Sequence, residues 1–152
     1  AACTGTATAA ISETDIVTGG KTIIITLADD VWVAAGATFN AERQAIINGL
    51  DSAQAEATGW DAVVKALQGV AGVVRTSDTV VTVTLDAQAT YDITATETIT
   101  VTVPASALVS SGVAVVGSPT FTVSAVGVAT AGRLMEGLLL RGGRLMGGRL
   151  AA

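Results

Sequence analysis

Between Thr79 and Pro104 the sequence twice alternates apolar residues with threonine or another polar residue. The apolar positions are Val81, Val83 and Leu85, and then Ile99, Val101 and Val103. Strict alternation places one row of side chains in a core and the other row in water, which is typical of half-buried antiparallel strands. The sequence therefore predicts a mainly β protein.

Other strand-like runs flank this segment. The predicted strands are residues 21–27, 73–74, 79–85, 98–103, 113–116 and 120–126. Pro104 should end the fourth of these because proline has no amide hydrogen to donate. Phe121, Val123 and Ala125 should share one face of the last. Six or seven short strands at this spacing favour an immunoglobulin-like β-sandwich.

A helical insertion interrupts the strands at about residues 40–68, where the apolar period changes to roughly 3.6. Asn40 can cap a helix whose apolar stripe consists of Ile46, Ile47 and Leu50. Gly49 should weaken that helix by about 1 kcal/mol relative to alanine. Residues 60–67 fit a second helical turn or a strand, and their pattern does not separate the two.

The chain length of 152 residues predicts one domain, and the composition of its two ends predicts an N-terminal arm over residues 1–10 and a C-terminal arm. Residues 1–10 contain no large apolar side chain, so they are expected to be ordered only if something pairs with them. The sandwich is predicted over residues 11–126 and a Gly/Arg/Leu-rich C-terminal arm over residues 127–152. Cys3, the single cysteine, has three interpretations: an inert small residue, a disulfide between subunits, or a lipid anchor.

Residues for catalysis or metal binding are scarce. The chain has no histidine, which excludes Ser-His-Asp and Cys-His arrangements, and one cysteine excludes the usual zinc sites. Asp29-Asp30 is predicted to be a turn, and Asp86, Asp92 and Glu97 to be solvated residues at strand ends. We therefore predict no enzymatic activity and no catalytic, cofactor-binding or metal-binding residue. Trp32 and Trp60 are predicted to be core anchors rather than ligand platforms.

Charge is distributed unevenly. Residues 1–130 hold four basic residues against twelve acids, a net charge of −8, whereas residues 131–152 hold four arginines against one glutamate, a net charge of +3. Such a contrast favours docking of the basic tail on an acidic surface, which can be the body of a neighbouring copy. Nucleic acid is not an expected partner, since four arginines without stacking aromatic residues make a thin electrostatic footprint.

The C-terminal segment carries a repeated motif, Gly-Arg-Leu-Met at residues 132–135 and 143–146, with a shortened copy at 148–150. Paired glycines interrupt any helix there. The favoured interpretation is an arm that becomes ordered on a partner; a solubilising tail and a membrane-surface helix are the alternatives. The predicted interface residues are Leu134, Met135, Leu138, Arg141, Arg144 and Leu145.

The run Tyr91-Asp-Ile-Thr-Ala-Thr-Glu-Thr-Ile-Thr-Val-Thr-Val-Pro104, followed by residues 105–108, resembles the late strands of immunoglobulin-like modules in tailed-bacteriophage virion proteins and some bacterial surface proteins. Residues 19–27, Trp32, 39–41 and 59–60 resemble the earlier part of the module. The resemblance spans about residues 11–126 and leaves both arms outside it. It implies that Tyr91 ties a strand corner to nearby backbone.

This resemblance implies a structural subunit of a phage virion. A capsid decoration or cement protein is the first choice, and a tail or head-fibre component is the next. The expected partners are other copies of the chain and other virion proteins, without a small-molecule substrate, cofactor or membrane. The alternative is a secreted or cell-surface immunoglobulin-like module that recognises a carbohydrate or a host protein. Solvent-exposed Trp32 and Trp60 would favour a sugar-binding role.

Overall fold

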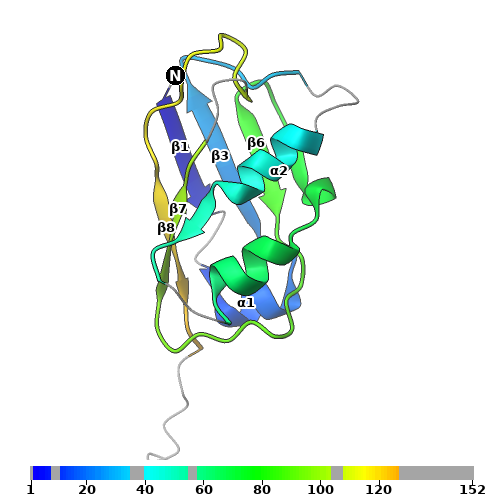
Figure 1. Cartoon of the computed structure of the whole chain (residues 1–152), viewed down its shortest axis with the longest axis vertical. Coiled ribbons are helices and arrows are strands. Elements are labelled where there is room, and N and C mark those ends of the chain that lie inside the picture. Colours follow the sequence, from blue (N-terminus) through cyan, green and yellow to red (C-terminus); the bar gives the residue numbers. More distant parts are fainter. Residues whose placement is uncertain (1, 8–10, 35–39, 55–57, 104–107, 127–152) are drawn as a thin grey trace, which may run out of the picture.

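The computed structural model describes residues 2–7, 11–34, 40–54, 58–103 and 108–126. Within these residues the chain is mainly strands in two sheets, with few helices, which confirms the prediction of a β-rich fold (Figure 1). The elements are β1 (Ala2–Ala7), β2 (Ile11–Ser12), α1 (Glu13–Thr18), β3 (Thr22–Ala28), α2 (Asn40–Asn48), β4 (Leu50–Ser52), the π-helix η1 (Trp60–Lys65), the 3-10 helix η2 (Val70–Gly72), β5 (Val73–Arg75), β6 (Val80–Thr84), β7 (Glu97–Val101) and β8 (Thr120–Ser124).

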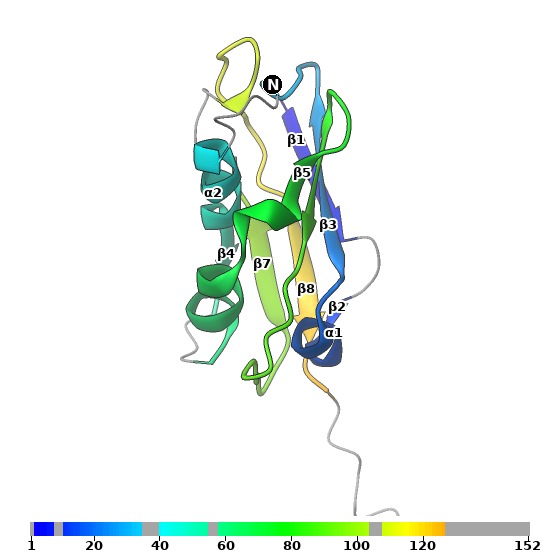
Figure 2. The ribbon, with the colours of Figure 1, turned by 90° about the vertical axis from the view of Figure 1, so that its right-hand side faces the viewer.

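Each of the two sheets has four strands. The first sheet has the order β1-β3-β6-β5 and is antiparallel throughout; the second has the order β2-β8-β7-β4, with β2 parallel to β8. Figure 2 shows the two sheets side by side, with α2 and η1 on the side of β4. Because α2 contacts both β4 and β5, the helical insertion closes this side of the core.

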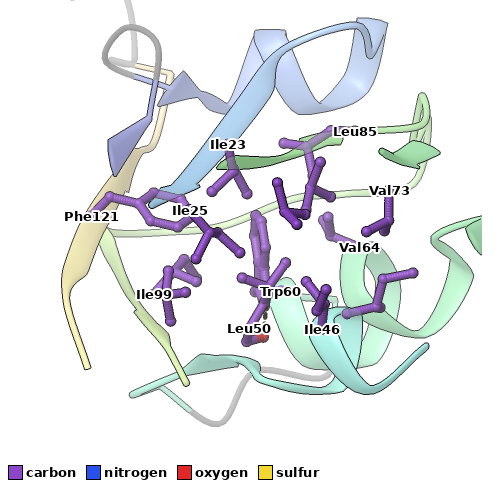
Figure 3. Close-up of a cluster of buried hydrophobic side chains, with 14 of the residues drawn as sticks. Ile23, Ile25, Ile46, Leu50, Trp60, Val64, Val73, Leu85, Ile99 and Phe121 are labelled. Atoms are coloured by element: carbon purple, nitrogen blue, oxygen red, sulfur yellow. Dashed lines mark hydrogen bonds between the residues drawn. The ribbon is translucent and has the colours of Figure 1, made fainter. Parts of the chain in front are cut away.

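Alternating residues of both sheets meet in one core (Figure 3). The inward-facing side chains of the longer strands are Ile23, Ile25, Leu27, Val81, Val83, Ile99, Val101, Phe121 and Val123, all buried. Trp60 of η1 packs edge-on against Phe121, with ring centroids 5.8 Å apart and an interplanar angle of 78°. Its indole Nε1 donates to the Leu50 carbonyl at 2.8 Å, so this buried polar group is satisfied.

Gly49 ends the predicted helix one residue before Leu50. The Gly49 amide donates to Ala45 and Ile46, while its carbonyl accepts from the Thr102 amide at 2.7 Å. A Cβ atom at position 49 would collide with the Thr102 carbonyl oxygen. Leu50 therefore belongs to β4 rather than to the helix stripe, and Gly49 allows the close approach of two backbones instead of weakening a helix interior.

The helix α1 was not predicted from the sequence. Ser12 caps it in a reciprocal capping box: the Ser12 hydroxyl accepts from the Asp15 amide, and the Asp15 carboxylate accepts from the Ser12 amide at 2.9 Å. The Ser12 backbone amide, more than any other contact, holds the pKa of Asp15 below its ordinary value of 3.8. Ile16 is fully buried, so this short helix is fastened to the core.

Two segments differ from the predicted strands. Residues 2–7, expected to be an arm in need of a partner, form β1, and the partner is β3 of the same chain. Residues 113–116, expected to be a strand, form no regular strand: they follow Gly112, whose φ is +70°, and Val113 and Val116 are exposed. Val115 alone of this run packs against the core, and it is only partly buried, so the apolar pattern here does not correspond to the inward face of a strand.

A third prediction was wrong: Glu97 was expected to be a solvated residue at a strand end, but it is fully buried. Its two carboxylate oxygens accept the Trp60 backbone amide at 3.0 and 3.3 Å, at the start of η1. A helix start leaves amides without internal partners, and an acidic group there is favourable. Glu97 thus couples η1 to β7.

We expect Gly49→Ala to lower the free energy of unfolding by about 1–3 kcal/mol, because the methyl group must displace the Thr102 carbonyl. Gly69→Ala is a matched control, since its Cβ would meet only the end of the Asp86 side chain, at 3.1 Å. Urea unfolding of both variants measures the difference. Equal midpoints for the two variants would contradict the close approach.

We expect Glu97→Leu to destabilise the fold by about 1–3 kcal/mol, because the Trp60 amide would be left buried without its carboxylate acceptor. Ile99→Leu, at the next inward position of β7, is the control and should cost less than about 1.5 kcal/mol. Thermal or urea unfolding checks both. A Glu97→Leu variant as stable as the wild-type chain would show that the buried carboxylate is not needed by η1.

Candidate interaction surface

Three connecting segments gather at one end of the sandwich: residues 29–34 after β3, residues 76–79 between β5 and β6, and residues 108–118 before β8. Figures 1 and 2 both place them at the end marked by the N-terminus. We call these three segments the loop cluster. They lie beyond the ends of the strands, where side chains are displayed without disturbing the core.

Trp32 holds the three segments together. Its indole Nε1 donates to the Thr79 carbonyl at 3.0 Å and its amide donates to the Asp78 carbonyl at 2.8 Å. It also forms an isolated β-bridge with Val109. Only 1% of the Trp32 side chain is exposed, which confirms its predicted role as a core anchor; the same fraction for Trp60 confirms that prediction too.

Asp30 provides a second link between the loops. Its carboxylate accepts the Val31 amide at 2.8 Å and, on the other oxygen, the Ser111 hydroxyl. The Ser111 hydroxyl is the main reason that the pKa of Asp30 lies below its ordinary value of 3.8, and the Val31 amide adds to the effect. The bond to Val31 confirms the predicted local turn, in which Asp29 adopts a left-handed backbone with a φ of 62°.

Arg75 fixes the remaining segment. Its guanidinium contacts the Asp78 carboxylate at 2.8 Å and the Trp32 carbonyl at 3.4 Å. The arginine therefore braces the turn at residues 76–79 against the segment after β3. Planar guanidinium donors suit such a double contact.

The outward side of the loop cluster combines apolar and acidic groups. Val113 and Val116 expose 54% and 65% of their surface, and Asp29 and Asp78 are exposed beside the buried anchors. Chemically, such a surface can receive aliphatic and positively charged groups of another protein. Among the residues that the structure describes, no group of three or more histidine, cysteine or acidic side chains could hold a metal ion.

The interface residues predicted from the sequence, Leu134, Met135, Leu138, Arg141, Arg144 and Leu145, all lie outside the described residues, so they remain predictions. The loop cluster was not predicted as a unit. The Asp29-Asp30 turn and the buried Trp32 were each predicted from the sequence, but the contacts of Trp32 with Thr79 and Val109 join positions far apart in the chain, so their gathering was not.

Comparisons with protein-family models, with curated proteins and with solved structures found no match to this chain. In the part of the chain covered by the structure, none of the helices has the length and apolar character needed to cross a membrane.

We expect Ser111→Ala to raise the pKa of Asp30 toward 3.8 without fully restoring it, because the Val31 amide still binds the carboxylate. Ser110→Ala is the neighbouring control and should leave that pKa unchanged. Carbon-13 NMR titration of the Asp30 carboxyl measures both variants.

A lowered folded-state pKa means that the contact stabilises the fold fully above pH 3.8 and loses its effect as the pH falls through the folded-state pKa. The stability difference between the wild-type chain and Ser111→Ala should therefore narrow in acid. A stability difference between the two chains that stays constant as the pH falls well below 3.8 would contradict the role of the Ser111 hydroxyl in lowering the pKa of Asp30.

Proposed function

We propose that this chain is a non-enzymatic structural subunit of a tailed-phage particle, a capsid decoration or cement protein or another virion protein, built on an immunoglobulin-like sandwich. It acts by adhesion: a rigid two-sheet body is positioned by terminal segments that contact other copies and other virion proteins. The observation that carries the proposal is the opposition between an acidic body and a basic, leucine-rich C-terminal segment, residues 127–152.

The strand order supports the immunoglobulin-like part of the proposal. If β1 and β2 are taken as two halves of a split first strand, β3 to β8 are the second to seventh strands. In this numbering the first sheet, β1-β3-β6-β5, has its strands in the order first, second, fifth, fourth. The second sheet, β2-β8-β7-β4, has the second half of the first strand, then the seventh, sixth and third strands. Immunoglobulin sandwiches have the ABED and CFG sheets in this order. Tyr91, buried between the fifth and sixth strands, occupies the corner where such sandwiches place a tyrosine.

The charges of the described body support adhesion. Basic side chains of the body are already paired with its own acids: Lys21 with Asp15, Lys65 with Asp51, and Arg75 with Asp78. Other acids, such as Asp29 and Asp92, remain on the surface. The arginines of the C-terminal segment therefore meet an attractive surface on any copy of the body, and screening by salt should weaken that attraction.

Repetition strengthens such contacts. An arm that becomes ordered only on binding loses conformational entropy, so a single contact is weak. On a repeating shell each copy contacts several neighbours, and the effective concentration of the second contact is high. The leucines supply apolar area to bury, and the arginines supply orientation toward carboxylates.

A cell-surface binding module is the second candidate, and the exposed Val113 and Val116 on the loop cluster favour it. Its carbohydrate-binding version loses support, because Trp32 and Trp60 are buried and offer no stacking platform. Recognition of a protein by the loop cluster would not need residues 127–152, so deletion of that segment separates the two candidates.

We expect the full chain to bind purified capsids of its phage and to associate in a salt-dependent way, and the chain ending at residue 130 to lose both the capsid binding and the salt-dependent part of the association. Removing residues 131–152 removes all four tail arginines together with the leucines. Sedimentation velocity at two salt concentrations measures self-association, and co-sedimentation measures capsid binding. A chain with residues 131–152 in scrambled order keeps the charge and composition of the segment, so it separates an effect of charge from an effect of the order of its residues.

Arg141→Gln combined with Arg144→Gln should shift association to higher protein concentration and reduce its salt dependence, because two attractive charges are lost. Full-length and truncated chains that are both monomeric, with neither bound to capsids, would contradict the proposed function.

A further inference from the structure

β3 is the longest described strand, and β1 covers one of its edges. The register pairs Ala7 with Ile23 and continues to Ala2 with Ala28, so six of the seven β3 residues are matched. Ile23, Ile25 and Leu27 are buried in the core. Without β1, β3 would be a long apolar edge strand, the type of edge that pairs readily with another chain.

β1 is unusual in its composition. Its residues, Ala-Cys-Thr-Gly-Thr-Ala, include no side chain larger than threonine. Because hydrophobic stabilisation scales with apolar area, a sequence of this composition has little such area to offer. The pairing that the structure shows for β1 is its six-residue backbone ladder with β3. A backbone ladder depends on register alone, so the same six residues of another copy would satisfy β3 equally well.

The connectivity permits such an exchange. β1 is the first element of the described chain, and three residues, 8–10, separate it from β2, which belongs to the other sheet and pairs with β8. Among the described strands β1 pairs with β3 alone, as an edge strand of the first sheet, and it also lies close to β8 of the other sheet. Its departure would break one ladder and leave the other strand pairings in place.

We propose that β1 is an exchangeable strand, and that the edge of β3 is a docking site for β1 of a second copy of this chain. Exchange of an identical element is a low-cost route to association, because the ladder that breaks within one copy re-forms between two copies. The remaining sheet edges fit this role poorly: β2, β4 and β5 have two or three residues each, too few for a long ladder. The exchange needs neither a virion nor the C-terminal segment, so it goes beyond the proposed function.

The ladder contains a position suited to a disulfide test. The Leu27 amide donates to the Thr79 carbonyl on the β6 side, so Leu27 directs its backbone polar groups away from β1. Cys3 and Leu27 are therefore a non-hydrogen-bonded pair of the antiparallel β1–β3 ladder. Cα atoms of such pairs are about 4.5 Å apart, within the range that a disulfide spans.

The experiment mixes two full-length chains of different mass. One is the wild-type chain, which carries Cys3, and the other carries Cys3→Ala and Leu27→Cys. Exchange brings the two cysteines together, because β1 of the first chain then lies on β3 of the second. We expect a cross-linked species containing one copy of each on a non-reducing gel, increasing with protein concentration. Because Leu27 is in the core, Thr4→Cys and Thr26→Cys, placed in separate Cys3→Ala chains, provide a second registered pair.

The matched control replaces Leu27→Cys by Val83→Cys, a buried position on β6 that β1 does not contact in the ladder. It should give no cross-link to wild-type Cys3. A single chain that carries both cysteines of a pair tests the register of β1 on β3, because the correct register allows a disulfide to form within that chain. Closure within single chains, without cross-links between mixed chains for either pair, would overturn the proposal. Cross-links of equal yield to Val83→Cys would overturn it as well, since random collision would then explain them.

Discussion

The two tryptophans of the core must each pair a buried indole N–H, and the arrangement of the helical insertion and the loops follows from how they do so. Only 3% of the residues are aromatic, so branched aliphatic side chains fill most of the layer between the sheets. Trp60 donates to the Leu50 carbonyl and packs against Phe121, which fixes η1 beside β4. Trp32 donates to the Thr79 carbonyl and thereby fastens the loop cluster. A buried N–H without an acceptor costs about 1–3 kcal/mol, so neither contact is dispensable.

Periodicity predicts an element when side chains hold it in place. The alternating runs of β3, β6, β7 and β8 were recognisable because every second residue enters the core. β1 was assigned to an arm because its attachment is a backbone ladder, which leaves no hydrophobic pattern. Residues 113–116 have the opposite property, an apolar pattern in which Val113 and Val116 are exposed and only Val115 is partly buried against the core. The start of α1 could have been predicted, since Ser12 and Asp15 have the spacing of a capping box.

The buried polar groups were harder to predict from the sequence. Glu97 continues the inward row of Ile99, so alternation places it in the core, but its charge favoured a position in solvent. Its acceptor role becomes evident only when the start of η1 is brought next to β7. Gly49 has an equally non-local cause, the approach of the Thr102 carbonyl. The predicted interface within residues 127–152 stays a prediction, and the loop cluster emerges only from tertiary contacts.

β1 ends, and the C-terminal segment begins, at the same end of the body, where Ala7 pairs with Ile23 at the start of β3. β2, which follows β1 after three residues, pairs Ser12 with Ser124 near the end of β8. The amide of Val126, the last residue described, donates to the Glu13 carboxylate at 2.9 Å, so the chain just before the C-terminal segment is tied to the start of α1, which follows β2 directly. A neighbour that receives β1 would therefore lie within reach of the C-terminal segment of the same copy. Two weak contacts to one neighbour reinforce each other through their effective concentration, while the loop cluster at the opposite end stays available to a different partner.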